Sequence, residues 1–98
     1  MRRGVCKNIL FDHAMELIRA GKVIVIDVRN INEDRTKRLP NSINIPVNEL
    51  TNRIGKIVLN KAQPILVYCA TGSRSIFACQ ILADYGYNTV YNLQGGVH

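Results

Sequence analysis

The sequence contains 98 residues, of which 47% are hydrophobic and 20% are charged, as expected for one globular domain. No apolar run approaches the roughly 20 residues of a membrane-spanning helix, and the N-terminal stretch lacks the apolar core of a signal peptide. We therefore expect a cytoplasmic protein without membrane association. Thirteen Lys and Arg residues against seven Asp and Glu residues give a formal net charge of +6. This bias either solubilises the surface or attracts small anions or an acidic protein. Nucleic acid is not an expected partner, because the aromatic residues are not interleaved with the basic ones.

The first part of the chain predicts a helix followed by a buried strand. Residues 9–20 carry apolar side chains at helical spacing, with Asp12 as the expected N-cap and Gly21 as the expected C-cap. The run KVIVIDV at 22–28 is rich in β-branched residues and does not alternate with polar ones. Such a run predicts a strand that is covered on both faces.

The middle of the chain repeats this alternation after a long polar loop at residues 29–42. The segment INIP at 43–46 predicts a short extended piece. Residues 48–59 carry apolar side chains on one helical face and predict a second helix. The apolar run ILVYC at 65–69 predicts another buried strand.

The last part of the chain predicts a helix from about Ser75 to Tyr85 and a short strand, TVYN, at 89–92. Alternating helices and strands are typical of an α/β domain, with a central parallel sheet and helices on both faces. We expect one such domain over residues 1–98.

The three cysteines, Cys6, Cys69 and Cys79, form an odd number without tight spacing, which argues against a disulfide framework. There is no Cys-x-x-Cys pair or histidine cluster, so we expect no metal site. Cys79 lies on the apolar side of its predicted helix and is expected in the core, whereas Cys6 is uninformative.

Two predicted strands end in reactive or charged side chains. Asp27 and Arg29 end one strand, and Cys69 ends the other. In a parallel sheet these carboxyl ends share one edge, where ligands bind. We expect Asp27 to accept backbone hydrogen bonds that brace the active loop. Arg29 either pairs with Glu33 or adds positive potential to the pocket.

Cys69 is followed by a short run of small and polar residues that leads into a helix: Ala70, Thr71, Gly72, Ser73, Arg74 and Ser75. Such a loop can curl with several backbone N–H groups pointing inward, which makes an anion-binding nest. The N-terminus of the following helix adds partial positive charge. Both features predict a lowered pKa and a reactive thiolate at Cys69.

Arg74 stands in the first turn of this helix, where a cation opposes the helix dipole. The helix has no acidic residue before Asp84 to compensate for it. Arg74 is therefore either a solvated side chain that tolerates the penalty or the partner of an anion bound in the loop.

The segments VIDVR (25–29), LPNSINIP (39–46), ILVYCATGSRS (65–75) and NLQGG (92–96) occur in this order and together resemble the single-domain form of the rhodanese family. The resemblance implies an α/β domain in which Cys69 carries a persulfide and residues 70–74 line the pocket. Four residues separate Cys69 from Arg74. Phosphatases of this fold have one more, so the spacing favours sulfur transfer over phosphatase chemistry.

The sequence departs from the family pattern in the loop after DVR and at its end. Glu33 matches the family's acid, but Asp34 replaces an aromatic residue, and Lys37 and Arg38 stand where Gly and His are expected. Family members also continue past Gly-Gly into a closing helix, whereas this sequence stops at His98. The sequence is therefore expected to be either a truncated chain or a natural short form.

Two functions follow from these features. The first is a sulfurtransferase that needs no cofactor, in which Cys69 takes sulfur from a small anionic donor such as thiosulfate and passes it to cyanide or a thiol. The second is a sulfur carrier or interaction module, in which the net charge and the basic residues at 35–38 dock an acidic protein.

Overall fold

The central sheet of the computed structural model has five strands in the order β1-β5-β4-β2-β3, and all paired neighbours run parallel. The structure describes residues 3–33 and 36–97. The strands are β1 (Val5–Ile9), β2 (Ile24–Asp27), β3 (Ile43–Asn44), β4 (Ile65–Tyr68) and β5 (Thr89–Leu93). The helices are α1 (Phe11–Arg19), the 3-10 turn η1 (Val47–Glu49), α2 (Leu50–Ile57) and α3 (Ser73–Asp84).

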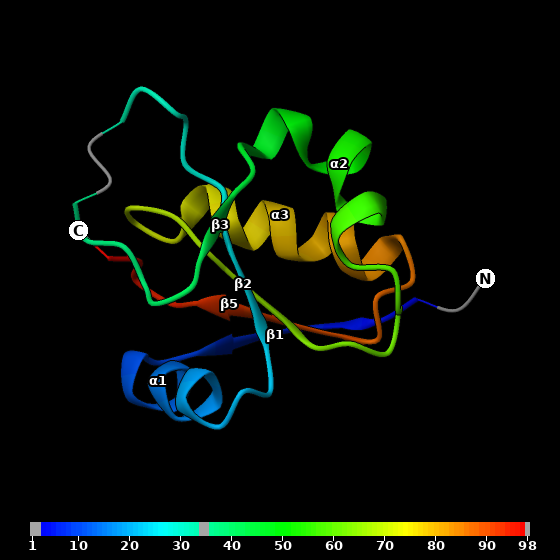
Figure 1. Cartoon of the computed structure of the whole chain (residues 1–98), viewed down its shortest axis with the longest axis horizontal. Helices are drawn as coiled ribbons and strands as arrows, with labels where there is room; N and C mark the ends of the chain where they lie inside the picture. The colour runs from blue at the N-terminus through cyan, green and yellow to red at the C-terminus, as the bar shows by residue number, and fades with distance from the viewer. Residues whose placement is uncertain (1–2, 34–35, 98) are drawn as a thin grey trace.

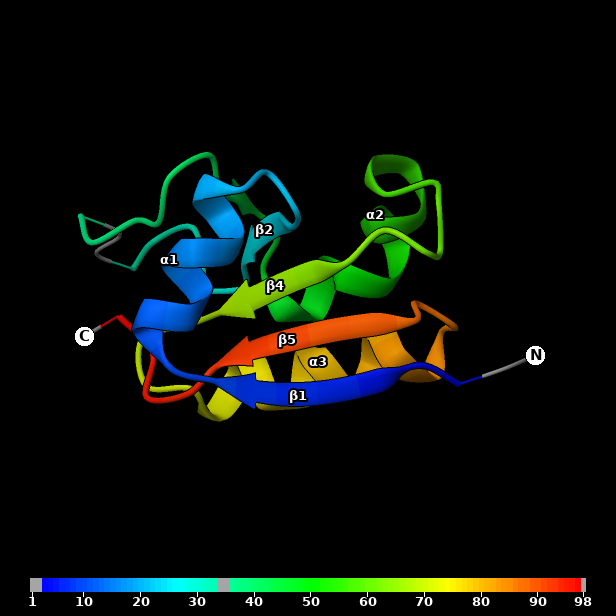
Figure 2. The same cartoon turned by 90° about the horizontal axis from the view of Figure 1, so that it is seen from below.

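Helices cover both faces of the sheet, as the alternating pattern predicted. Figure 1 shows α2 and α3 on one side of the strands and α1 on the other, and Figure 2 shows the same arrangement from below. Two buried clusters fill the layers: Ile26, Val67 and Leu82 belong to the α3 side, and Leu66 and Leu93 to the α1 side. All four residues of β4 are buried because both faces of this strand are covered.

The boundaries of all three helices differ from the predicted ones. The helix predicted over 48–59 is the 3-10 turn η1 followed by the shorter α2. Helix α1 begins at Phe11 with Leu10 as its N-cap, so Asp12 lies inside the first turn instead of capping it. The C-cap of this helix is Ala20 instead of the expected Gly21, which follows it with a positive φ of 67°. Helix α3 begins at Ser73, before the predicted start, because Gly72 with φ 93° turns the chain directly into the helix.

The edge strand β1 and a disulfide were not predicted. β1 pairs with β5 along its whole length, but Val5, Lys7 and Asn8 are exposed, so the strand lacks a recognisable apolar run. The structure joins Cys6 of β1 to Cys79 of α3 in a disulfide with a Cα–Cα distance of 5.6 Å. The argument against disulfides was therefore wrong for this pair, because their proximity depends on a strand that the pattern did not indicate. Cys79 is buried in the core, as expected.

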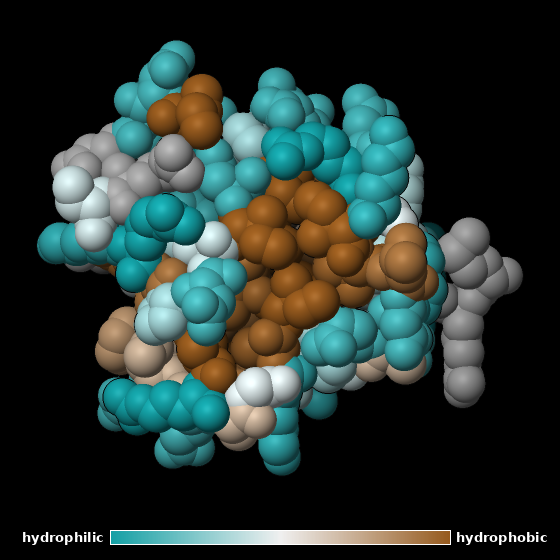
Figure 3. Space-filling view, in the orientation of Figure 1, coloured by the Kyte–Doolittle hydropathy of each residue, from teal (hydrophilic) through white to brown (hydrophobic). Residues whose placement is uncertain are grey.

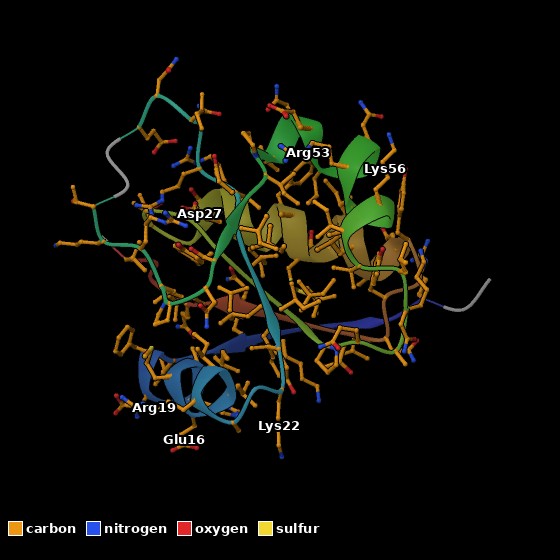
Figure 4. All side chains as sticks on the ribbon, in the orientation of Figure 1. Glu16, Arg19, Lys22, Asp27, Arg53 and Lys56 are labelled. Atoms are coloured by element: carbon orange, nitrogen blue, oxygen red, sulfur yellow. A yellow bond between two sulfur atoms is a disulfide. The ribbon has the colours of Figure 1, made fainter. Side chains whose placement is uncertain are left out.

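The face of the molecule drawn in Figures 3 and 4 combines scattered charge with an apolar area. Figure 4 shows Glu16, Arg19 and Lys22 pointing outward near α1, and Arg53 and Lys56 pointing outward from α2. Between these helices, the space-filling view shows an apolar patch (Figure 3). A groove of about 260 Å³ lies beside the edge strand β3. Its apolar lining includes Ile18, Val23, Ile24, Ile43 and Ile57. Within the described residues, no helix has the length and apolar character that crossing a membrane requires.

Candidate active site

Cys69 directly follows β4 and is fully buried at the carboxyl edge of the sheet. Its Sγ accepts hydrogen bonds from the backbone N–H groups of Gly72, at 3.1 Å, and Ser75, at 3.4 Å. The Ser75 hydroxyl oxygen also lies 3.4 Å from Sγ. The loop therefore curls around the sulfur with its N–H groups pointing inward. This is the arrangement that the small residues of the loop predicted.

These contacts shift the pKa of the Cys69 thiol in opposing directions. Burial is the strongest single influence and raises the pKa of the Cys69 thiol. The hydrogen bonds from the Ser75 hydroxyl and from the backbone N–H groups of Ser75, Thr71 and Gly72 act in the opposite direction and together prevail, so the pKa is lowered below its ordinary value. The same contacts that enclose the sulfur thus favour its thiolate form.

The second glycine of the NLQGG segment, Gly96, packs against the Cys69 loop. A Cβ on Gly96 would lie 2.3 Å from the carbonyl oxygen of Ala70 and 2.6 Å from that of Cys69. The next residue, Val97, donates its backbone N–H to the Cys69 carbonyl at 3.1 Å. This supporting role was missed from the sequence, although a pair of glycines after a strand is a signal of close backbone approach.

Arg74 forms a two-pronged ion pair with Glu33, which comes from the loop between β2 and β3. Arg74 Nη2 lies 2.9 Å from Glu33 Oε2, and Nη1 contacts Oε1. The hydrogen bond to Glu33 is the main cause of a raised Arg74 pKa, and the charge of Cys69 adds to it. The acid that α3 lacks in its first turn is therefore supplied by a residue distant in sequence.

Asp27 and Arg29 form a second, fully enclosed ion pair at the end of β2, with a distance of 3.0 Å between Arg29 Nη2 and Asp27 Oδ2. Asp27 accepts the backbone N–H of Arg29, also at 3.0 Å, and the Tyr68 hydroxyl lies 3.3 Å from its Oδ2. The expected backbone bond to Asp27 therefore exists, but it comes from Arg29 instead of the Cys69 loop. Of the two roles expected for Arg29, the ion pair with Glu33 is not formed, since Arg29 pairs with Asp27 and Glu33 with Arg74.

The comparison with known families agrees with this geometry. The sequence matches the rhodanese-like domain family over residues 11–98. The chain belongs to the rhodanese family.

Individual relatives of this rhodanese-like domain include enzymes named for sulfur transfer. The chain is 30% identical to the thiosulfate sulfurtransferase GlpE of Coxiella burnetii, over 92% of the chain and 82% of that protein. It is 37% identical to the thiosulfate sulfurtransferase PspE of Escherichia coli K12 over 71% of the chain and 67% of that protein. A rhodanese-related protein from Thermoplasma volcanium superposes with a TM-score of 0.79 at 34% identity, over 94% of the chain and 87% of that structure. For several curated relatives the chain spans about two-thirds of their length.

The part of the basic 35–38 stretch that the structure describes borders a groove of this rhodanese-like domain. Lys37 and Arg38 are exposed and line a groove of about 580 Å³ together with Phe11, Leu39 and Val97. Arg38 also donates to the carbonyl of Ser42 at 2.9 Å. Asp34 and Arg35 lie outside the described residues. Among the residues described, no group of three or more His, Cys, Asp or Glu side chains is arranged to hold a metal ion.

Proposed function

We propose that this protein is a sulfurtransferase that carries a sulfane sulfur on Cys69, taken from thiosulfate or a similar donor and passed to a thiol or cyanide. The observation that carries the proposal is the set of N–H and O–H groups that surround Cys69 Sγ. These groups stabilise negative charge on sulfur, both in the free thiolate and in a persulfide. The names of the relatives GlpE and PspE support the same reaction class.

In the first half-reaction, the Cys69 thiolate attacks the outer sulfur of thiosulfate. A new S–S bond forms to Cys69, and the S–S bond of thiosulfate breaks, so that sulfite leaves with the bonding electron pair. The backbone N–H groups of residues 70–75 line the pocket and hold the transferred sulfur. No oxidant, metal or organic cofactor takes part in this exchange.

In the second half-reaction, an acceptor thiolate or cyanide attacks the outer sulfur of the persulfide. The bond between the two sulfurs breaks, and its electron pair returns to Cys69 as the thiolate. Asp27 and Arg29 are supporting residues in this proposal, because their ion pair is buried at the end of β2 and Asp27 contacts the hydroxyl of Tyr68, the residue before Cys69.

The alternative of phosphatase chemistry is disfavoured by the length of the loop. Four residues stand between Cys69 and Arg74, and a shorter loop crowds a tetrahedral phosphate group. The loop also has Arg74 engaged with Glu33 instead of facing the pocket alone.

A sulfur carrier that serves an acidic protein partner is the second candidate. The exposed Lys37 and Arg38 favour it, because they place positive charge beside an apolar groove. In that case small donors would turn over poorly even at saturation, and a partner protein would raise the rate steeply.

Intact mass spectrometry after incubation with thiosulfate tests the proposal. We expect a mass gain of one sulfur atom, reversed by cyanide or a thiol and absent in Cys69→Ser. Incubation with a phosphate monoester is the matched comparison. Hydrolysis of the ester without sulfur loading would contradict the proposal and show that the protein is a phosphatase.

A further inference from the structure

The carboxylate of Glu33 is fixed in place from two sides. Its Oε1 accepts the backbone N–H of Asn30 at 2.8 Å, within its own loop. Both carboxylate oxygens also face Arg74, and the side chains of Glu33 and Arg74 are only 30% and 34% exposed. A two-pronged arginine–carboxylate pair is geometrically specific and restricts both partners. Glu33 is therefore a built component of the Cys69 loop's surroundings, although it lies on a different loop.

This pair changes the charge that a sulfur donor meets. The Cys69 thiolate is negative, and the positive charge of Arg74 is matched by the negative charge of Glu33. The guanidinium of Arg29 is likewise matched by Asp27. Positive potential for a donor then comes from backbone N–H groups and the α3 N-terminus, which the thiolate already uses, from the part of the Arg74 charge that Glu33 leaves, and from the exposed Lys37 and Arg38.

We propose that Glu33 is a specificity-determining residue: its negative charge disfavours dianionic sulfur donors relative to monoanionic ones. This inference rests on the proposed sulfur transfer and names the class of donor that the site prefers. Donors of the favoured class include organic thiosulfonates and the persulfides of thiols.

The favoured donors obey the same balance of atoms and electrons as thiosulfate. With an organic persulfide, the Cys69 thiolate attacks the outer sulfur, the S–S bond of the donor breaks, and a thiolate leaves with the electron pair. With methanethiosulfonate, the leaving group is methanesulfinate, whereas thiosulfate releases sulfite. The two sulfonyl-type donors therefore share one mechanism and differ by one unit of charge.

The test compares thiosulfate with methanethiosulfonate in wild type and in Glu33→Gln, with the same thiol acceptor. Glutamine keeps an oxygen acceptor for Arg74 and for Asn30 but removes the negative charge. We expect the ratio of kcat/KM for thiosulfate to kcat/KM for methanethiosulfonate to rise about 5- to 10-fold, as one charge at a distance of several ångströms in a partly exposed site would produce. The ratio is informative because both donors are attacked by the same thiolate, so a change in Cys69 reactivity cancels.

Two control variants isolate the charge. Glu33→Asp keeps it and should leave the ratio near that of wild type. Glu49→Gln breaks an exposed pair of the same chemistry, with Arg53 at 3.1 Å, and should also leave the ratio unchanged. If Glu33→Gln does not fold, Glu33→Ser is the second neutral variant for the same comparison.

The outcomes separate this inference from the proposed function. If both donors load sulfur on Cys69 but the ratio stays constant or falls in the neutral variants, Glu33 holds Arg74 for the dianion and the inference is overturned. If neither donor loads sulfur on wild type, the proposed function fails and this inference fails with it.

Discussion

Gly96 lies against the backbone of Ala70 so closely that the position has no room for a side chain. Gly95 also has a positive φ, of 85°, but a Cβ there would meet nothing within 4 Å. An alanine at either position would meet backbone strain, but only at Gly96 would it also meet a steric clash. The two glycines are therefore a matched pair for mutation.

Gly96→Ala should lower the free energy of unfolding by about 2 to 4 kcal/mol, since left-handed strain and overpacking add together. Gly95→Ala should cost only about 1 kcal/mol, from the strain alone. We also expect Gly96→Ala to slow sulfur loading per folded molecule, because the displaced contact is with the Cys69 loop. Chemical denaturation and intact mass measure the two effects. Equal losses in both variants would show that the contact with Ala70 has no role.

Ser75→Ala should raise the pKa of Cys69, because it removes the hydroxyl that helps to lower it. Ser73→Ala is the matched control, since Ser73 is exposed and its hydroxyl contacts Thr71 at 3.1 Å. The pH dependence of thiolate absorbance reports the pKa directly, because Cys69 is the free cysteine. We expect the transition of Ser75→Ala to move to higher pH and that of Ser73→Ala to stay with wild type. A shift of the same size in both variants would contradict the role of Ser75.

The Glu33–Arg74 pair should make the free energy of unfolding depend on pH in the acidic range. The hydrogen bond from Arg74 holds the pKa of Glu33 at about 2, below its usual 4.5. A carboxyl whose pKa is lower in the folded state stabilises the fold above the unfolded pKa, and this contribution is lost as pH falls toward the folded pKa. Because both side chains are partly exposed, we expect roughly 1 kcal/mol. Wild type should exceed Glu33→Gln by this amount at pH 6, and the difference should disappear between about pH 4.5 and 2. A difference that is independent of pH would mean that the charge is not its source.

The Cys6–Cys79 disulfide should stabilise the fold without taking part in sulfur transfer. It spans 73 residues of sequence, for which the loss of chain entropy predicts roughly 4 kcal/mol. Cys6→Ser should lose this amount, and Cys79→Ala should lose about 1 to 2 kcal/mol more, because it also leaves a cavity in the core. Sulfur loading per folded molecule should be unchanged in both. Reducing agent should destabilise wild type and leave Cys6→Ser unaffected, and equal sensitivity of the two proteins would argue against the bond.

The parallel sheet and the surroundings of Cys69 were accessible from sequence because their signals are local. The run ILVYC predicts a strand covered on both faces, and the small residues after Cys69 predict the inward N–H groups. The features that could not be predicted from the sequence depend on contacts between distant segments. Glu33 and Arg74 are 41 residues apart, so no local pattern could pair them. Cys6 and Val5 lie in an edge strand with half-exposed or exposed side chains, whose pattern does not differ from that of a loop.

The last prediction concerns Arg74, for which the sequence allowed either a solvated side chain or the partner of a bound anion, and which the structure places against Glu33. Arg74→Ala should lower kcat/KM for thiosulfate at least about 10-fold, because it removes charge-assisted bonds worth roughly 1.5 to 3 kcal/mol. It also leaves the Glu33 carboxylate uncompensated beside an anionic donor, so the double variant Glu33→Gln/Arg74→Ala should recover part of this loss. Arg74→Lys should recover part as well, since lysine restores charge but not the forked geometry.

Transfer from preformed persulfide to a neutral thiol acceptor should suffer much less in Arg74→Ala, because that half-reaction has no sulfonate to hold. Rapid-mixing measurements of the two half-reactions separate these effects, and equal slowing of both would show that Arg74 supports the loop and does not bind the donor.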